Sequence, residues 1–195
     1  EITEELEQKG IRLLHENQLN DEQKDFIQRF YLEKLNGSTN PIWLSQIKEI
    51  GATADDGIFL AIKRMEWIEG KKKPKIDYAL IAMPDKEIGR FVRLPKSDEK
   101  ENIMFLDDVI RYCLPMIFVG SGNCTYEAYS FKFTKDAEME MDNDLGSGVM
   151  QKVARGVKSR KSGEPIRVIY DDSMPKDLLK HIMSRLNIDT LDTIV

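Results

Sequence analysis

The fold of this chain is constrained most strongly by the stretch from Tyr126 to Asp171, where two strand-like segments flank a helix-like one. The first segment, YEAYSFKFT, alternates as a half-buried strand does, and the last, IRVIY, is a compact β-branched strand. Between them the sequence predicts a basic amphipathic helix over 145–161, which Gly163 and Pro165 end. A β–α–β unit of about 45 residues is long enough for a parallel crossover, which this pattern therefore indicates.

Five acidic residues stand between the first strand and the helix. In principle they could hold Mg²⁺, which prefers oxygen ligands. Alternating along an extended segment, however, they would share one face and repel one another unless they were solvated. Negative charge also suits the exposed N–H groups of a first helical turn. An exposed capping face is the preferred interpretation for Asp136, Glu138, Glu140, Asp142 and Asp144.

The helix over 145–161 carries most of the candidate binding residues. Lys152, Arg155 and Ser159 fall on one helical face, which could line a path for a polyanionic chain. Cations near a helix C-terminus also complement its dipole, and this plainer interpretation is favoured. No aromatic residue is interleaved, which weakens a single-stranded nucleic-acid interpretation. The candidate polyanion-binding residues are Lys152, Arg155, Lys158, Arg160 and Lys161.

The chain has two histidines, and neither has a visible catalytic setting. His15 lies in a loop, and His181 lies at the polar face or edge of the last helix, so solvated positions are expected. A catalytic histidine needs an orienting partner and a pocket, and the sequence shows neither. The runs at 120–122 and 146–148 do not have phosphate-loop spacing and are interpreted as turns. We therefore expect no catalytic and no metal-binding residue here.

The rest of the chain alternates helical and strand-like segments. Helices are expected over 1–9, from Asn20 to about Leu35, over 107–117 and over 173–186, with Asp107 or Asp108 as the cap of the third. Strand-like segments cover 58–65, 78–83, 90–94 and 102–106. The prediction is an α+β fold: a mixed sheet of about five or six strands with three helices, preceded by a helical arm. The break at 36–41 divides the chain into the arm, 1–36, and a main domain, 37–195.

Composition limits the function classes. The 195 residues are 41% hydrophobic and 32% charged, as in an ordinary globular protein, and the net charge is −5. That charge argues against whole-surface attraction to nucleic acid or membrane. Cys113 and Cys124 are expected to be reduced thiols, and no signal peptide or long apolar run occurs, so a cytoplasmic protein without membrane insertion is expected. The two ends of the chain suggest a fragment of a longer protein.

Four long motifs resemble one enzyme family. YEAYSFKFTKDAEMEMDND, RKSGEPIRVIYDDSMPKDLL and ENIMFLDDVIRYCLPMIF are similar to the middle, or head, domain of bacterial class 1 polyphosphate kinases. Upstream, KGIRLLHENQLNDEQKDFIQRFYLEKL resembles the junction between the N-terminal helical domain of that family and its head domain. The resemblance runs in order from Gly10 to Val195. It implies that residues 1–36 end the helical domain and that 37–195 form the head domain.

The resemblance implies a parent enzyme that reversibly transfers the terminal phosphate of ATP to polyphosphate through a phosphohistidine, with Mg²⁺. The family's catalytic histidines belong to C-terminal domains, and no stretch of this sequence matches their motifs. The segment itself is therefore expected to be inactive and to hold no cofactor. Its expected partners are the remaining domains of the parent chain and further copies in a homo-oligomer, with polyphosphate possible.

Two functions from different classes remain open. In the first, the segment is a structural head domain that serves subunit contacts and shapes the path into the active site. In the second, it is a freestanding module that binds a polyanion through the basic helix 145–161. The first is preferred, because phosphoryl transfer needs dense positive charge and a metal, and the segment shows no such constellation.

Overall fold

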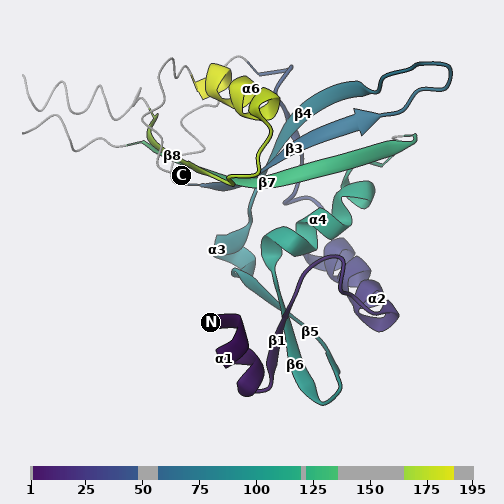
Figure 1. Ribbon diagram of the computed structural model, residues 1–195, viewed down its shortest axis with the longest axis vertical. Coiled ribbons are helices and arrows are strands. Elements are labelled where there is room, and N and C mark those ends of the chain that lie inside the picture. Colours follow the sequence, from purple (N-terminus) through teal and green to yellow (C-terminus); the bar gives the residue numbers. More distant parts are fainter. Residues whose placement is uncertain (1, 48–56, 120–121, 136–164, 187–195) are drawn as a thin grey trace, which may run out of the picture.

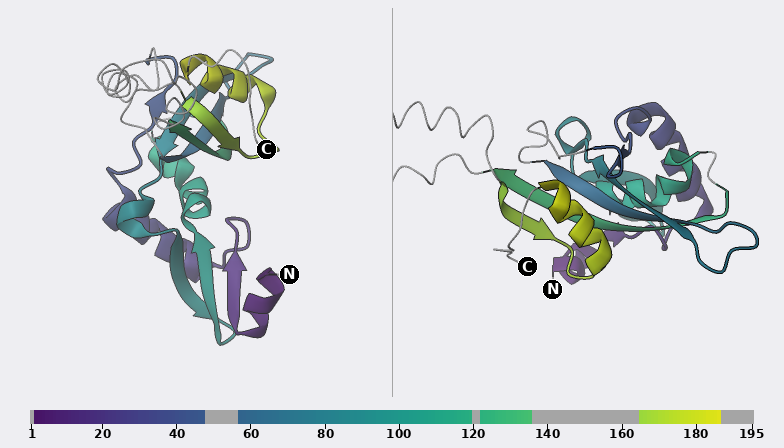
Figure 2. Two further views of the ribbon diagram at one scale, coloured as in Figure 1. Left: turned by 90° about the vertical axis from the view of Figure 1, so that its left-hand side faces the viewer. Right: turned by 90° about the horizontal axis from the view of Figure 1, so that it is seen from above.

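The computed structural model describes residues 2–47, 57–119, 122–135 and 165–186. Their strands form two separate sheets, one of three strands and one of five. The molecule is elongated, with the two sheets at opposite ends and helix α4 (Leu106–Ile117) between them (Figures 1 and 2). The placement of α4 decides which residues can meet, because the helix touches both sheets.

The three-stranded sheet has the order β1 (Ile11–Leu14), β6 (Lys100–Phe105), β5 (Phe91–Ser97). Strand β1 runs parallel to β6, and β5 runs antiparallel to β6. Helix α1 (Ile2–Gln8) precedes β1, and Gly10 makes the reversal between them at a φ of 76°, a region that glycine adopts without steric cost. The N-terminal segment thus supplies a strand as well as helices.

The five-stranded sheet has the order β2 (Ile42–Trp43), β4 (Lys75–Ala82), β3 (Ile58–Glu66), β7 (Cys124–Lys135), β8 (Pro165–Tyr170). Every neighbouring pair in it is antiparallel. The strand-like segments 58–65 and 78–83 form an antiparallel hairpin, since β3 and β4 pair along eight positions from Phe59↔Ala82 to Glu66↔Lys75. Strand β3 lies in the centre, and its first five residues, 58–62, are apolar on both faces, as a covered central strand requires.

The parallel crossover predicted for 126–171 is wrong. Strands β7 and β8 are direct antiparallel neighbours, with Phe131 opposite Tyr170 and Phe133 opposite Val168. The length of a connection sets only a minimum for a parallel crossover, and an equally long connection can return the chain antiparallel. The predicted helix over 145–161 and the acidic residues before it lie outside the described residues.

Two helical segments lie between β1 and β2, and a short helix lies between β4 and β5. Helix α2 (Asp21–Phe30) begins with a capping box, in which the Asn20 side chain accepts from the N–H of Gln23 and the Gln23 side chain accepts from the N–H of Asn20. A π-helical turn, η1 (Tyr31–Leu35), continues it. A short helix, α3 (Asp85–Ile88), links β4 to β5.

Helix α4 follows β6 directly, and its cap differs from the prediction. Its N-cap is Phe105, so neither Asp107 nor Asp108 caps it. Both acids instead lie in the first turn, where they favour the helix dipole and are available to side chains from other elements. Pro115 lies inside the helix, two residues before it ends at Ile117.

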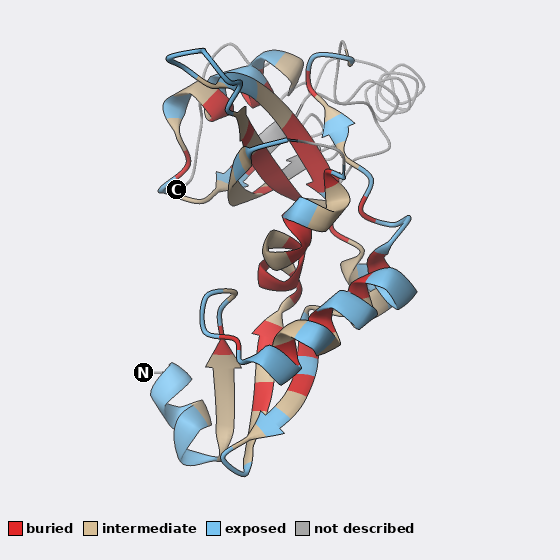
Figure 3. Cartoon of the chain, turned by 90° about the vertical axis from the view of Figure 1, so that its right-hand side faces the viewer, coloured by how far each residue is buried: buried red, intermediate tan, exposed pale blue. Residues whose placement is uncertain are grey.

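The two faces of the five-stranded sheet belong to different cores. One core joins Leu60 and Ile62 of β3 to the inner face of α4, to α2 and η1, and to Val92 and Met104 of the three-stranded sheet. Figure 3 shows this buried band running through α4 between the sheets. The second core lies on the other face, under helix α6 (Lys176–Leu186), and contains Phe131, Leu178 and Ile182 among others.

The α+β class is confirmed, although the strands divide between two sheets instead of forming the single mixed sheet that was expected. The expected helical arm is not detached, because β1 pairs with β6, and Ile27, Tyr31 and Leu35 are buried in the same core as α4. A domain boundary at 36/37 stays a prediction. Among the helices described here, none is both long enough and apolar enough to cross a lipid bilayer.

Candidate functional site

A cavity of about 810 Å³ lies at the junction of the two sheets. Its walls come from four elements: the loop after β1, helix α4, strand β7 and the turn between β8 and α6. These elements are far apart in the sequence and meet because α4 packs between the sheets. The lining residues are His15, Glu16, Asn17, Gln18, Asp108, Arg111, Tyr112, Leu114, Pro115, Tyr126, Glu127, Ala128, Tyr129, Asp171 and Ser173.

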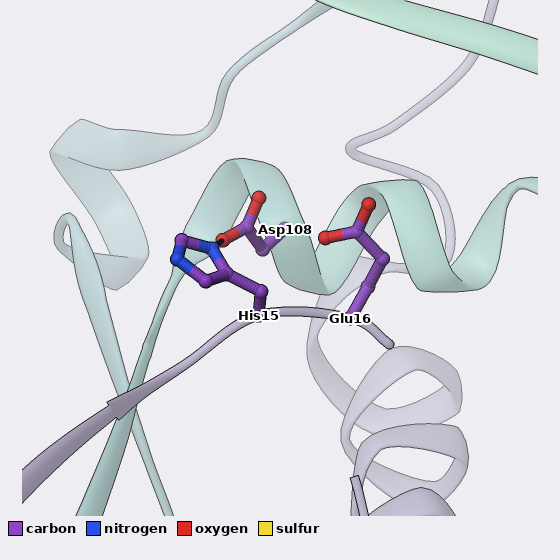
Figure 4. Close-up of side chains that lie close together, drawn as sticks. All are labelled: His15, Glu16 and Asp108. Atoms are coloured by element: carbon purple, nitrogen blue, oxygen red, sulfur yellow. Dashed lines mark hydrogen bonds and ion pairs between the residues drawn. The ribbon is translucent and has the colours of Figure 1, made fainter. Parts of the chain in front are cut away.

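His15 and Asp108 connect the loop after β1 to α4. The His15 Nδ1 lies 2.9 Å from the Asp108 Oδ2, and the side chain of Asp108 is only 7% exposed. The backbone N–H of His15 donates to the Gln18 Oε1 at 2.9 Å, which closes the loop on itself. Figure 4 shows His15 and Glu16 reaching from this loop toward Asp108 on the helix. His15 therefore has the orienting partner and the pocket that the sequence did not show.

Among the described residues that line the cavity, Arg111 is the only arginine or lysine, and its guanidinium group is already engaged. Its Nη1 pairs with the Asp108 Oδ1 and lies 3.8 Å from the Asp107 Oδ2. Its Nε donates to the carbonyl oxygen of Ala128 at 3.1 Å, and its Nη2 donates to the Ser130 Oγ at 3.3 Å. Arg111 thus ties α4 to strand β7, and its positive charge is shared between two carboxylates.

Apart from Arg111 and His15, the charged residues described in the cavity wall are carboxylates. Glu16, Asp108, Glu127 and Asp171 give four carboxylates against the single guanidinium of Arg111. Hydrogen bonds from the hydroxyl and N–H of Ser173, with the positive charge of Arg111, lower the pKa of Asp171 despite its partial burial. Burial, together with the negative charge of Glu127, raises the pKa of Tyr129. An excess of carboxylates repels phosphate and favours a cation.

A second polar cluster fastens α6 to the five-stranded sheet. The Lys63 Nζ lies 2.8 Å from the Asp177 Oδ2, and the Tyr78 hydroxyl donates to the same oxygen at 2.8 Å. Burial and the neighbouring carboxylate raise the pKa of Tyr78 to about 12. The ring of His181 lies against that of Tyr78, with centroids 4.3 Å apart. These contacts occupy His181, so this cluster has a structural role.

Some of the residues singled out from the sequence lie in the described part of the structure, and others lie outside it. The candidate polyanion-binding residues Lys152, Arg155, Lys158, Arg160 and Lys161 lie outside the described residues. Cys113 is a buried free thiol, and burial raises its pKa to about 12. His15, by contrast, was expected to be merely solvated. The adjacent acids Asp107 and Asp108 were a signal that the sequence offered for this site. The cap and dipole roles at the start of a helix need only one acid, so the other is available to a partner such as His15.

Comparisons with known proteins identify the family. The model of the polyphosphate kinase middle domain matches residues 22–195. Proteins named polyphosphate kinase are similar over the whole chain, at 30% identity in Escherichia coli, 31% in Salmonella typhimurium and 28% in Vibrio parahaemolyticus. The chain spans 28% of the length of each of these relatives.

The crystal structure of polyphosphate kinase from Porphyromonas gingivalis also matches all of this chain. The match has a TM-score of 0.73 at 27% sequence identity and covers 26% of that protein. The arrangement of two sheets around α4 is therefore shared with a solved member of the same family. This chain belongs to the family of polyphosphate kinase middle domains.

Proposed function

We propose that this chain is the structural middle domain of an enzyme that transfers the terminal phosphate of ATP to polyphosphate. Its relatives are named polyphosphate kinase, and the chain spans 28% of their length, which leaves most of such a protein to other segments. The reaction is proposed to pass through a phosphohistidine outside this segment and to use Mg²⁺ with ATP. The parent is proposed to act in the cytoplasm.

The charge of the cavity at the sheet junction is the observation that carries the structural role. Enzymes that transfer phosphoryl groups surround the reacting oxygens with cations and metal ions. Among the described residues, four carboxylates face the cavity, and the guanidinium group of Arg111 is engaged by Asp107 and Asp108. A triphosphate or polyphosphate placed in this cavity would meet net repulsion, so we assign the cavity no part in phosphate binding.

Subunit and domain contacts are the proposed role of the outer surface. Phe91 on edge strand β5, Ile169 on edge strand β8 and Leu32 next to α2 each expose a large apolar side chain. Single exposed apolar residues are common, but edge strands with unpaired backbone groups are ready sites for another chain. The proposed partners are the other domains of the parent chain and further copies in a homo-oligomer.

Synthesis of polyphosphate by the purified 195-residue chain tests this proposal. The chain is incubated with ATP and Mg²⁺ after circular dichroism has shown that it is folded, beside a full-length polyphosphate kinase as the positive control. We expect polymer from the full-length enzyme and none from the segment. Synthesis by the segment, at a rate that scales with its concentration, would show that it carries the chemistry itself.

A polyanion-binding module is the alternative, and the clustered cations between 152 and 161 are what favour it. Binding through such a cluster releases counterions from the polyanion, so it weakens steeply as the salt concentration rises. The test is polyphosphate binding at low ionic strength by the chain and by a Lys152→Glu, Arg155→Glu variant. Salt-dependent binding that the variant loses supports the alternative, whereas absence of binding at low salt excludes it and leaves the structural role.

A further inference from the structure

We propose that His15, Glu16 and Asp108 bind one divalent transition-metal ion at the mouth of the cavity. One nitrogen and two carboxylate oxygens are the donors that Mn²⁺, Co²⁺ and Zn²⁺ accept in proteins. The ion would connect the loop after β1 to helix α4. It would thereby tie the three-stranded sheet to the helix that packs between the two sheets. The site is separate from the Mg²⁺ and ATP proposed for the parent enzyme's reaction.

The distances between the donor atoms suit a single ion. One ligand atom from each of the three residues lies within 4.8 Å of the other two. The His15 Nδ1 and the Asp108 Oδ2 are 2.9 Å apart. Two neighbouring ligands at right angles around an ion with bonds of about 2.1 Å are separated by about 3 Å. Only Glu16, on the same exposed loop as His15, has to close in, and its flexible side chain permits this movement.

The groups behind the donors hold them in place. Arg111 binds the Asp108 Oδ1 and leaves the Oδ2 directed to His15. Arg111 is itself fixed by the Ala128 carbonyl and by Ser130 of β7. On the loop, the Gln18 side chain fixes the backbone of His15. Ligating carboxylates and histidines are usually oriented by such outer hydrogen bonds, which also adjust metal affinity.

The charge balance of the site leaves room for a cation. Asp108 is paired with Arg111, and Asp107 lies between Arg111 and Arg90. Within the described part of the chain, Glu16 enters no ion pair, and Glu127 and Asp171 add further negative charge across the cavity. A proton on His15 would supply one positive charge as an ordinary ion pair with Asp108. A divalent ion supplies two positive charges and also engages Glu16. The involvement of Glu16 therefore distinguishes a bound metal ion from a simple ion pair between His15 and Asp108.

Paramagnetic Co²⁺ is the probe, because it accepts this donor set and perturbs nearby nuclei. The chain has two histidines, so its imidazole proton signals form two resolvable sets. The 195-residue chain, freed of metal, is titrated at about pH 7.5, where free imidazole is mostly neutral. We expect the His15 signals to shift or broaden at the first equivalent, while the signals of His181, on α6, stay sharp.

Matched variants identify the ligands. His15 is exposed and Glu16 is half-buried on the loop after β1, so His15→Gln and Glu16→Gln should leave the fold intact, whereas changing Asp108 would also disturb Arg111. Each is expected to weaken Co²⁺ binding by about tenfold or more, a loss at least as large as that for outer-sphere partners. The controls His181→Gln and Glu22→Gln, also at exposed positions, should bind as the parent chain does.

Two results would overturn the proposal. One is a His15 signal that responds to pH but not to Co²⁺, which would leave only the histidine–aspartate ion pair. The other is binding that survives both His15→Gln and Glu16→Gln, or that His181→Gln abolishes, which would place the ion elsewhere. Polyphosphate synthesis is not measured, so the outcome is independent of the function proposed for the segment.

Discussion

Single charged residues at the sheet junction are held by partners from other elements, and Arg111 has the most of them. It contacts Asp107 and Asp108 on its own helix and Ala128 and Ser130 on β7. Because Asp108 is almost fully buried, its carboxylate depends on these contacts for compensation of its charge. The energetic role of Arg111 is therefore to keep a buried negative charge paired.

Replacing Arg111 with methionine should lower the free energy of unfolding by about 3 kcal/mol, because it leaves a buried carboxylate without its main partner. Urea unfolding followed by circular dichroism measures this change. The same substitution at Arg29, which is exposed on α2, should change the free energy by no more than about 0.5 kcal/mol. Equal effects at the two positions would show that the buried pair does not stabilise the fold.

The contribution of Asp177 to the free energy of unfolding depends on pH in the acid range. Burial alone would raise its pKa, but hydrogen bonds from Lys63, from Tyr78 and from the N–H of Leu178 outweigh it and hold the pKa below the ordinary value of 3.8. The ionised form thus stabilises the fold above pH 3.8, and the contribution disappears as the pH falls through the lowered pKa. We expect Asp177→Asn to cost about 1 kcal/mol or less at pH 7 and nothing once Asp177 is protonated.

Urea unfolding of the parent chain and of Asp177→Asn, measured from neutral pH down into the acid range, checks this expectation. The difference between their unfolding free energies should shrink toward zero in acid. The substitution Asp25→Asn, at an exposed position on α2, serves as the control for a general effect of charge. A difference that is constant with pH would mean that the ionisation of Asp177 is not linked to folding.

Among the elements, those with strong local signals were predictable. The capping box at Asn20 and Gln23 and the β3–β4 hairpin are specified by neighbours in the sequence. The pairing of β1 with β6 and the antiparallel order of β7 and β8 depend on contacts between distant segments, which periodicity does not report. The site shares this limit, because His15 and Asp108 are separated by 93 positions. The residue types of the site could be read from the sequence, but their proximity in the folded chain could not.

Helix α4 is the element on which the two sheets depend, and Ile110 is fully buried at its centre. Replacing Ile110 with alanine removes packed methyl groups and leaves a cavity, so we expect a loss of about 3 kcal/mol in unfolding free energy. The control Leu32→Ala changes a side chain that is 61% exposed and should cost no more than about 0.5 kcal/mol. A small loss at Ile110 would mean that the sheets hold together without α4.

At the scale of the whole molecule, one core runs from the three-stranded sheet through α4 to one face of the five-stranded sheet. Because buried residues of both sheets pack in this one core, local unfolding of one sheet would also remove contacts that stabilise the other. The chain should therefore unfold in a single transition, as domains with one cooperative core do. The elongated outline does not by itself imply two independent units.

Cooperativity can be measured with Trp43, which packs edge-to-face on Phe118 with centroids 5.4 Å apart. The sequence contains two tryptophans, so Trp67→Phe leaves Trp43 as the single tryptophan, which is excited selectively at long wavelength. Its fluorescence and the far-ultraviolet circular dichroism should give the same midpoint in urea. Two separate midpoints would show that the sheets unfold independently, and the joint core would then be too weak to couple them.

The central claim is that this middle domain supplies structure while the phosphoryl chemistry belongs to the rest of its parent enzyme. Intact-mass spectrometry of the folded chain after incubation with ATP and Mg²⁺ tests it most directly, because it detects a phosphate on either of the two histidines. The predicted result is an unmodified chain over the period in which a full-length polyphosphate kinase becomes phosphorylated. Stoichiometric phosphate on His15 or His181 would contradict the claim and place a phosphorylated intermediate within this segment.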